Sequence, residues 1–342
     1  MRASTIESGK LVTKDTEKPV PSNGQVLVRN LACGICGSDL HLFKMVEKSA
    51  EAFEGMVLGH EFCAEILEFG PNTQQLHSVG QRVCSIPYLK SGESQDPIGV
   101  SEKTPGAYSE YMLLSEDFLV AVPDATPTEA AALVEPLAVA IHAVAKSNLK
   151  ANDKVLVMGT GPIGLAIIAV LKLRGINAIV ASDFSAMRRS LARKMGATLS
   201  VDPADHSPFE DLASLTEADT NNALIFDCIG AKGLLADICR QAPDKSRVVI
   251  AGLCTEEDKF NPFIAMTKEL NIQFVFYYQT EEFSEALQIL SENKINWRPL
   301  VTGKVGLDGI AGAFQALQNP ESHAKIIIDP WLSGDEIISV SL

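Results

Sequence analysis

The sequence lacks any apolar run long enough to cross a bilayer. Its longest uninterrupted run, residues 162–171, falls well short of the roughly 20 residues that a spanning helix needs. The N-terminus, MRASTIESGK, also has no apolar segment of signal-peptide length. Both absences predict a cytoplasmic protein.

Positive charge is scarce as well. The chain has 29 Lys and Arg against 43 Asp and Glu, giving a formal net charge of −14 at pH 7. Its isoelectric point is near 4.9. A surface of this charge repels nucleic-acid phosphates and anionic lipids, so we expect no nucleic acid and no membrane among its partners.

A disulfide framework is absent too. Seven cysteines, an odd number, are scattered through 342 residues, whereas disulfide scaffolds are short chains with paired cysteines. We expect reduced thiols, some of them available as metal ligands. The length and the 46% hydrophobic content suffice for two domains with separate cores.

The first third of the chain has the pattern of a β domain. Residues 25–31, 63–68 and 81–86 alternate apolar with polar side chains between glycines and prolines, which predicts strands of a barrel-like domain ending near residue 122. The polar run 91–104 is expected to be a surface loop. Alanine-rich residues 128–145 predict a helix.

Residues 154–183 read as a βαβ unit. An apolar run meets a glycine turn, a nearly all-apolar helix follows, and a second apolar run ends on Asp183. Glycines at 159, 161 and 164 suit a tight turn, the approach of a pyrophosphate and close helix packing. Pro162 fits the first helical position, and free N–H groups there favour an anion. Methyltransferases use similar turns, but the whole series in order predicts dinucleotide binding.

The remaining pattern completes a doubly wound parallel sheet of six strands. After a helix at 185–195, strands are expected at 198–201, 223–226, 247–251 and 272–278. Ligands of such sheets lie beyond the carboxyl ends of the strands. The expected cofactor-binding residues are Gly159, Gly161, Pro162, Ile163, Gly164, Asp183, Arg188, Cys228, Gly252 and Leu253.

The tail is expected to hold helices at 283–292 and 307–317 and a strand at 325–328. Residues 335–342 carry no interpretable pattern.

Two dense clusters in the first domain carry metal-binding side chains: GICGSDLH at 34–41 and GHE at 59–61. Thiolate, imidazole and carboxylate are ligands that zinc prefers, and a catalytic zinc uses three of them and keeps one position open. Cys36, His60 and an acid would supply this set. Taken singly, each is better explained as an ordinary core or surface side chain, but the set together indicates a metal site.

These clusters and six further motifs resemble the zinc-dependent medium-chain alcohol dehydrogenases, in the branch of the sorbitol, threonine and butanediol dehydrogenases. The matching motifs cover nearly the whole chain in the family's order: GICGSDLH, GHE, VGQRV, GAYSEYMLL, LVEPLAVAIHA, VLVMGTGPIGL, DFSAMR and WRPLVTGKVGL. The resemblance implies a chaperonin-10-like β-barrel catalytic domain (1–135), an NAD-binding Rossmann domain (136–277) and a C-terminal part (278–342) that completes the barrel.

The resemblance also assigns roles. Cys36 and His60 match zinc ligands, and Glu61 matches an acid that binds the metal in some members and acts indirectly in others. Glu135 matches a carboxylate at the remaining position, bound directly or through water.

The same resemblance implies catalytic partners of these ligands. Asp39 would hold the His60 imidazole, and Ser38 and His41 would pass the alcohol's proton to solvent. Arg188 would lie beside the adenosine ribose. The strand at 272–278 would join subunits into a homodimer or homotetramer.

Three departures from the family pattern matter. No cysteine lies between Cys84 and Tyr108, where many members bind a structural zinc, so we expect one catalytic zinc only. Leu42 stands where polyol enzymes tend to have an aromatic, and Tyr277 where they have arginine. Both changes favour a small alcohol, diol or hydroxy-ketone over a long polyol.

The predicted function is therefore a zinc-dependent oxidoreductase that moves a hydride between a secondary alcohol and NAD. The alternatives are a zinc-free, NADPH-dependent quinone or enoyl reductase of the same fold and a non-catalytic nucleotide-binding redox sensor. Members of the zinc-free reductase branch lack the set formed by Cys36, GHE and Glu135, which this chain has. A protein that has lost turnover, such as a redox sensor, usually loses these metal-binding residues, and here they are present. The Cys33–Cys36 pair alone is weak evidence for thiol redox chemistry, because no second such pair exists.

Overall fold

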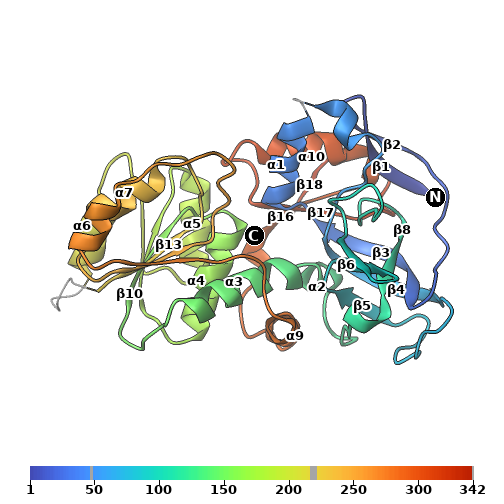
Figure 1. Cartoon of the computed structure of the whole chain (residues 1–342), viewed down its shortest axis with the longest axis horizontal. Helices are drawn as coiled ribbons and strands as arrows, with labels where there is room; N and C mark the ends of the chain where they lie inside the picture. The colour runs from blue at the N-terminus through green and yellow to red at the C-terminus, as the bar shows by residue number, and fades with distance from the viewer. Residues whose placement is uncertain (47–48, 216–221, 341–342) are drawn as a thin grey trace. The chain divides into compact units, whose positions relative to one another are not determined.

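A computed structural model describes residues 1–46, 49–215 and 222–340 (Figure 1). The chain forms two compact units. The barrel unit comprises Met1–Glu135, Phe283–Asn293 and Val301–Leu342, and the parallel-sheet unit comprises Pro136–Glu282 and Lys294–Leu300. Within the described residues, no helix combines the length and apolar character needed to cross a membrane.

The barrel unit is built on one eight-stranded sheet. Its strands follow the order β18-β16-β17-β3-β4-β5-β9, and β8 pairs with β3 beside this path. The bounds are β3 Gln25–Gly34, β4 Glu61–Phe69, β5 Arg82–Ser85, β8 Tyr111–Ser115, β9 Leu119–Ala121, β16 Val301–Val305, β17 Lys325–Ile328 and β18 Ile338–Ser339. Two hairpins complete the strands: β1 Arg2–Glu7 with β2 Lys10–Asp15, and β6 Tyr88–Ser91 with β7 Ser94–Pro97.

β3 is the central strand because it has partners on both sides. It pairs antiparallel with β4 along most of its length, and with β8 near its start. At its end Cys33 and Gly34 pair with β17, so the C-terminal segment extends the same sheet. The GICGSDLH segment therefore begins at the end of β3, where β3 pairs with β4 on one side and with the C-terminal strand β17 on the other.

Helices of the barrel unit cover this sheet. They are α1 Gly37–Val46, α2 Thr128–Ala131, α10 Ile310–Leu317 and the C-terminal part of α9 Thr280–Ser291, with short 3-10 turns at Ala50–Phe53, Glu116–Phe118 and Leu307–Gly309. Phe314 of α10 packs with Phe43 of α1 and with buried residues of β3 and β17 in one core. This packing fixes α1, whose first turn carries most of the candidate site.

The parallel-sheet unit has the predicted six strands, in the order β12-β11-β10-β13-β14-β15, all parallel. Its elements are α3 Val134–Lys146, β10 Lys154–Met158, α4 Pro162–Leu173, β11 Ala178–Ser182, α5 Ala186–Met195, β12 Leu199–Val201, α6 Pro208–Ser214, β13 Leu224–Asp227, α7 Leu234–Gln241, β14 Arg247–Ile250, α8 Pro262–Thr267, β15 Asn271–Phe274 and a 3-10 turn at Arg298–Leu300. The Rossmann fold class is confirmed.

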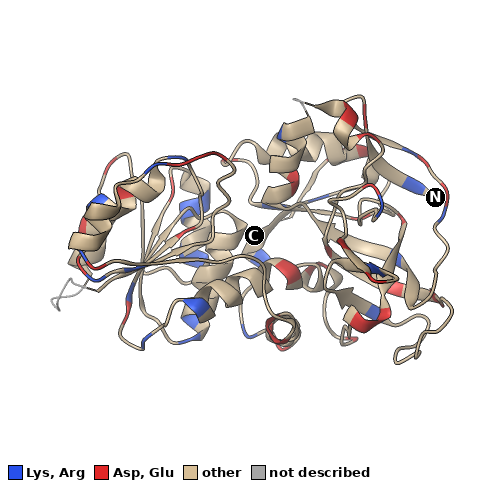
Figure 2. Ribbon diagram, in the orientation of Figure 1, with Lys and Arg blue, Asp and Glu red and all other residues tan. Residues whose placement is uncertain are grey.

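Acidic and basic residues are interspersed along both units (Figure 2).

Both faces of the sheet are covered at its central strands, which is why β10, β11, β13 and β14 are almost entirely buried. Leu156 and Met158 of β10 pack in one cluster with Phe209 of α6 and Ile238 of α7. The alternating residue Val157 lies against Gly164 of α4 on the other face. The sheet is therefore doubly wound around β10, the strand that leads into the glycine turn.

Two local predictions in the first half are wrong. The helix expected over 128–145 is interrupted between α2 and α3, because Pro136 has no N–H with which to continue the helical bonding from the preceding turn. The expected loop 91–104 contains β7, which folds back on β6 through a two-residue turn at Gly92 and Glu93. Gly92 has φ +62°, which suits such a turn.

The last strand is also shorter than predicted. β15 ends at Phe274 rather than Tyr278, because Phe274 pairs with Ile250, the last residue of its partner β14. Further along, Tyr277 has φ +65°, a left-handed conformation that cannot belong to a strand. At the end of the chain, Ile338–Ser339 add β18 antiparallel to β16, where the sequence predicted no structure. Residues 341–342 lie outside the described part of the chain.

Candidate active site

Cys36 lies directly before α1 and is held there by Asp39. The backbone N–H of Cys36 donates to Oδ2 of Asp39 at 2.9 Å. This is half of a capping box, in which an acid in the first helical turn satisfies the N–H of the residue before the helix. The helix start thus fixes the backbone that presents the Cys36 thiol.

His60 lies between two residues of the same helical turn. Its Nδ1 is 3.4 Å from Oδ1 of Asp39, and its Nε2 is 3.3 Å from Oγ of Ser38. The imidazole is therefore oriented with Nδ1 toward a buried carboxylate and Nε2 toward the start of α1. Ser38 and Asp39 of the GICGSDLH cluster thus meet His60 of the GHE cluster.

Asp39 and His60 each shift the pKa of the other. Burial acts to raise the pKa of Asp39, but the neighbouring His60 and the hydrogen bonds from Cys36 and Tyr108 outweigh it, so that the pKa falls below its usual value. Burial acts to lower the pKa of His60, and Asp39 outweighs that effect and raises it well above normal. The carboxylate is thus kept ionised to hold the imidazole.

Glu61 follows His60 and is fully buried. The ammonium group of Lys325, on β17, donates to both of its carboxylate oxygens and, at 3.1 Å, to the carbonyl of Ile35. Sequence reasoning missed Lys325. No motif marks it, because a lone lysine in the apolar run KIII shows its role only when β17 joins the sheet beside Gly34.

Glu135 lies in the first turn of α3 and is buried. Burial acts to lower the pKa of Lys325, but the charges of Glu61, Cys36 and Glu135 raise it above its usual value. In the described parts of the chain, no three His, Cys, Asp or Glu side chains gather closely enough to form a complete metal site. The donor types nevertheless fit zinc, and the Asp39 carboxylate behind His60 is the usual partner of a metal-binding imidazole.

Three polar side chains near the start of α1 differ in their solvent exposure. Asp39 is buried, Ser38 is partly exposed and His41 is exposed. Ser38 contacts His60, but among the described residues no hydrogen bond joins Ser38 to His41. The structure therefore brings Ser38 to the site and leaves His41 at its solvent side.

The glycine turn has the geometry that the motif predicts. Pro162 is the first residue of α4, with Ile163 next to it. A Cβ on Gly164 would lie 1.9 Å from the carbonyl oxygen of Gly159, so only glycine permits this close packing. A Cβ on Gly161 would meet only Nη1 of Arg188, at 3.9 Å. Arg188 thus lies over the turn where a phosphate would approach.

Asp183 ends β11 beside this turn. Its Oδ2 accepts the backbone N–H of Thr160 at 2.8 Å, and its Oδ1 accepts that of Ser185 at 2.9 Å. These bonds orient the carboxylate at the carboxyl edge of the sheet. The neighbouring Arg189 is committed to Asp202, so Arg188 is the arginine that faces the glycine turn.

Apolar side chains are exposed at the carboxyl ends of the strands. Phe184 after β11, Ile229 after β13 and Leu253 after β14 are all exposed, although most large apolar side chains of this unit are buried. Cys228 and Gly252 lie at the same ends, and burial raises the pKa of Cys228 well above its usual value. An exposed apolar rim at this edge is what a bound ligand would cover.

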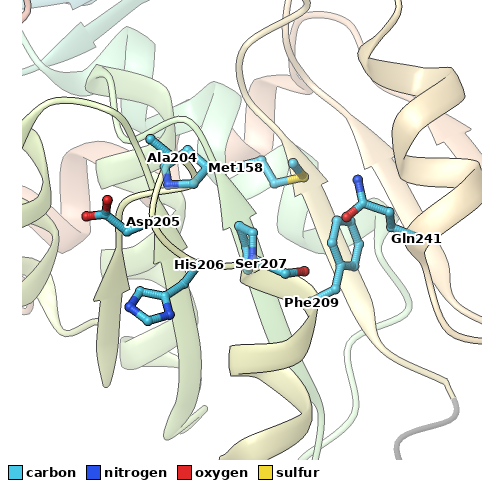
Figure 3. A pocket seen from close by; sticks show the side chains of 9 residues that line it. Met158, Ala204, Asp205, His206, Ser207, Phe209 and Gln241 are labelled. Carbon is cyan, nitrogen blue, oxygen red and sulfur yellow. The ribbon is translucent and has the colours of Figure 1, made fainter.

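A cavity of about 370 Å³ lies on the α6 side of the sheet. Met158, directly before Gly159, lines it together with Phe209 of α6, Gln241 of α7 and the loop that contains His206 (Figure 3). Polar side chains, among them Asp205, His206 and Gln241, contribute to its lining about as much as apolar ones. Sequence reasoning missed this cavity because separate loops form it.

Comparison with known proteins places these features in a family. Residues 22–124 match the profile of the alcohol dehydrogenase GroES-like domain, and residues 162–292 that of the zinc-binding dehydrogenases. The chain is 31% identical to (R,R)-butanediol dehydrogenase of Bacillus subtilis (strain 168), over 92% of this chain and 95% of the relative. The chain belongs to the zinc-dependent medium-chain alcohol dehydrogenase family. It is also 29% identical to sorbitol dehydrogenase of the same organism, over 96% and 97% of the two chains.

Solved structures of dehydrogenases share this fold. The chain resembles 2R,3R-butanediol dehydrogenase from Bacillus subtilis with a TM-score of 0.83 and 29% identity, covering 96% of this chain and 99% of the other. A zinc-binding dehydrogenase from Sinorhizobium meliloti 1021 bound to NADP has a TM-score of 0.85 and 25% identity, with the same coverage. A dehydrogenase from E. coli CFT073 complexed with NADH has the same TM-score, identity and coverage. As a medium-chain alcohol dehydrogenase, the protein is an oxidoreductase.

Proposed function

We propose that this protein is a zinc-dependent dehydrogenase that transfers a hydride between a secondary alcohol and NAD. The observation that carries the proposal is the meeting of Cys36, Ser38 and His60 at the start of α1, with Asp39 behind the imidazole. The comparisons give no support to the quinone reductase alternative or to a non-catalytic sensor.

Cys36, His60 and Glu135 are the residues that we propose to hold one zinc ion. When bound, zinc would act as a Lewis acid on the substrate oxygen and lower the pKa of the alcohol hydroxyl. Glu61 would support the site indirectly, because Lys325 occupies both of its oxygens. The buried Lys325 would also offset the negative charge that the acids bring to this region.

Ser38 and His41 would move the proton. The Ser38 hydroxyl, already within 3.3 Å of Nε2 of His60, would accept the proton that leaves the alcohol and donate its own outward. His41, exposed on the same helix, would pass a proton to water. Burial, followed by the nearby Lys44, lowers the pKa of His41, so its imidazole is neutral and able to accept a proton at pH 7.

NAD is the cofactor that the residues favour. Asp183 would accept hydrogen bonds from the adenosine ribose and repel the 2′-phosphate of NADP. Arg188, expected from the sequence beside that ribose, lies next to Gly161 and would contact the cofactor between the ribose and the phosphates. We propose that adenine binds toward the cavity beside Met158. Cys228, Gly252 and Leu253 would lie along the rest of the cofactor, at the carboxyl ends of β13 and β14.

We infer that the substrate is a short secondary alcohol, a vicinal diol or a small hydroxy-ketone. Leu42 and Tyr277 offer fewer partners to distant hydroxyls than the aromatic and arginine of polyol enzymes. A hydroxyl left unpaired in such a pocket would cost about 1–3 kcal/mol.

Kinetics and metal analysis on the purified protein test this proposal together. We expect about one zinc per chain, higher kcat/KM with NAD than with NADP, and 2,3-butanediol oxidised at least as efficiently as sorbitol. Absence of both zinc and alcohol oxidation would refute the function. An NADP efficiency equal to or above that of NAD would reverse the cofactor, and a tenfold advantage of sorbitol would overturn only the substrate ranking.

We also propose that subunits pair through β15, the edge strand of the parallel sheet. Its unpaired edge is flanked by exposed apolar side chains, among them Phe274 (62% exposed) and Phe276 (84%), with Phe263 and Met266 of α8. We expect a homodimer or a homotetramer by light scattering at micromolar concentration, and Phe274→Lys should shift it toward monomer. A wild-type monomer would contradict the proposal.

A further inference from the structure

Tyr108 is a third partner of Asp39 that the sequence motifs did not indicate. Its side chain is fully buried, and its hydroxyl donates to Oδ2 of Asp39 at 2.7 Å. Tyr108 lies in the segment that runs into β8, where its backbone N–H donates to the carbonyl of Leu58 at 3.0 Å. The segment before His60 and the segment that carries Tyr108 are therefore joined directly.

The ring of Tyr108 is fixed from several sides. A Cβ on Gly59 would lie 2.5 Å from the ring, so the glycine of GHE is what allows the phenol to lie against the chain next to His60. Phe314 contacts the ring edge-on, with centroids 6.1 Å apart, and itself contacts Phe43 of α1. The hydroxyl therefore has one position available, next to Asp39.

The hydrogen bonds of Asp39 divide between its two oxygens. Oδ2 accepts from the Cys36 N–H and from the Tyr108 hydroxyl, while Oδ1 faces Nδ1 of His60. Burial, followed by the charge of Asp39, raises the pKa of Tyr108, so the phenol remains a proton donor. With Oδ2 held from two directions the carboxylate cannot rotate, and Oδ1 remains available to the imidazole.

We propose that Tyr108 is a positioning residue for the zinc site: its hydroxyl locks the Asp39 carboxylate so that one oxygen holds the Cys36 backbone and the other holds Nδ1 of His60. Nε2 of His60 is then the nitrogen presented to the metal. One phenol thus sets the position of two ligands. This inference rests on the zinc site of the proposed function.

The test is the zinc affinity of Tyr108→Phe, measured by competition with a chromogenic chelator. Phenylalanine keeps the ring packing and removes only the oxygen. Loss of a group that orients a metal ligand through its partner typically weakens metal binding by about 10–100-fold, and we expect a value near the lower end because Asp39 itself remains. Tyr111→Phe, a matched loss of one phenol oxygen on β8 away from Asp39, should leave the affinity unchanged.

Asp39→Asn supplies a second measurement. If Tyr108 acts through Asp39, adding Tyr108→Phe to Asp39→Asn should change the zinc dissociation constant less than about twofold, since coupled residues are non-additive. Unchanged zinc affinity in Tyr108→Phe, with only a lower melting temperature of the zinc-free protein, would show a merely structural role and overturn the inference. A wild type that binds no zinc would instead refute the proposed function. Tyr108→Phe alone decides the matter if Asp39→Asn does not fold.

Discussion

Cys36→Ser should lose zinc and reduce turnover at least about a hundredfold while NAD binding remains. The thiolate is the strongest donor of the proposed set, and Lewis-acid polarisation supplies several kcal/mol, with about 1.4 kcal/mol for each factor of ten in rate. The proposed NAD-binding residues belong to the parallel-sheet unit, whereas Cys36 belongs to the barrel unit. Metal analysis, steady-state kinetics and NADH fluorescence titration measure the three quantities separately.

Cys33→Ser is the matched control. Cys33 lies three residues earlier and is buried in the barrel core, so its replacement should leave the zinc content and turnover close to wild type. It also tests the thiol-pair alternative, in which both cysteines would be needed. Full activity of Cys36→Ser after exhaustive chelation would show that the zinc site is wrongly assigned.

Lys325→Met should destabilise the barrel unit by about 3–5 kcal/mol, because it leaves a buried carboxylate without its counter-ion. Glu61 and Lys325 are 0% and 1% exposed, so water cannot replace the lost partner. Methionine keeps the length and most of the volume of lysine, which limits the cavity contribution. Urea unfolding of the zinc-free protein, followed by circular dichroism, gives the change.

The double variant Glu61→Gln with Lys325→Met separates charge from packing. Removing both charges together should recover most of the lost stability, since the penalty arises from the unpaired carboxylate rather than from the missing contact. A double variant as unstable as Lys325→Met alone would show that the buried charge is not the cause. Lys232→Met, at the exposed pair with Glu256, should have little effect on stability.

The sequence by itself determined the parts of the protein that depend on local geometry. The six-stranded doubly wound sheet followed from strands alternating with helices. The turn from Gly159 to Gly164 followed from its glycines, of which Gly159 has a positive φ and Gly164 packs against the Gly159 carbonyl. The dense motifs around Cys36 and His60 predicted that these residues share a site, and α1 and Asp39 bring them together. The strands, helices and turns can be read from a chain because neighbours in sequence create them, whereas the shared site of Cys36 and His60 was indicated by their side-chain chemistry.

Only the tertiary structure decided the contacts between residues far apart in the chain. Lys325 meets Glu61 because the C-terminal strand β17 joins β3, and Tyr108 meets Asp39 because the approach to β8 packs on Gly59. The end of β15 was set by the end of its partner β14 at Ile250, which an apolar run does not reveal. A buried charge or hydroxyl needs a hydrogen-bonding partner. Which distant residue supplies that partner depends on the order and register of the strands, and the hydrophobic periodicity of the sequence specifies neither across distant strands.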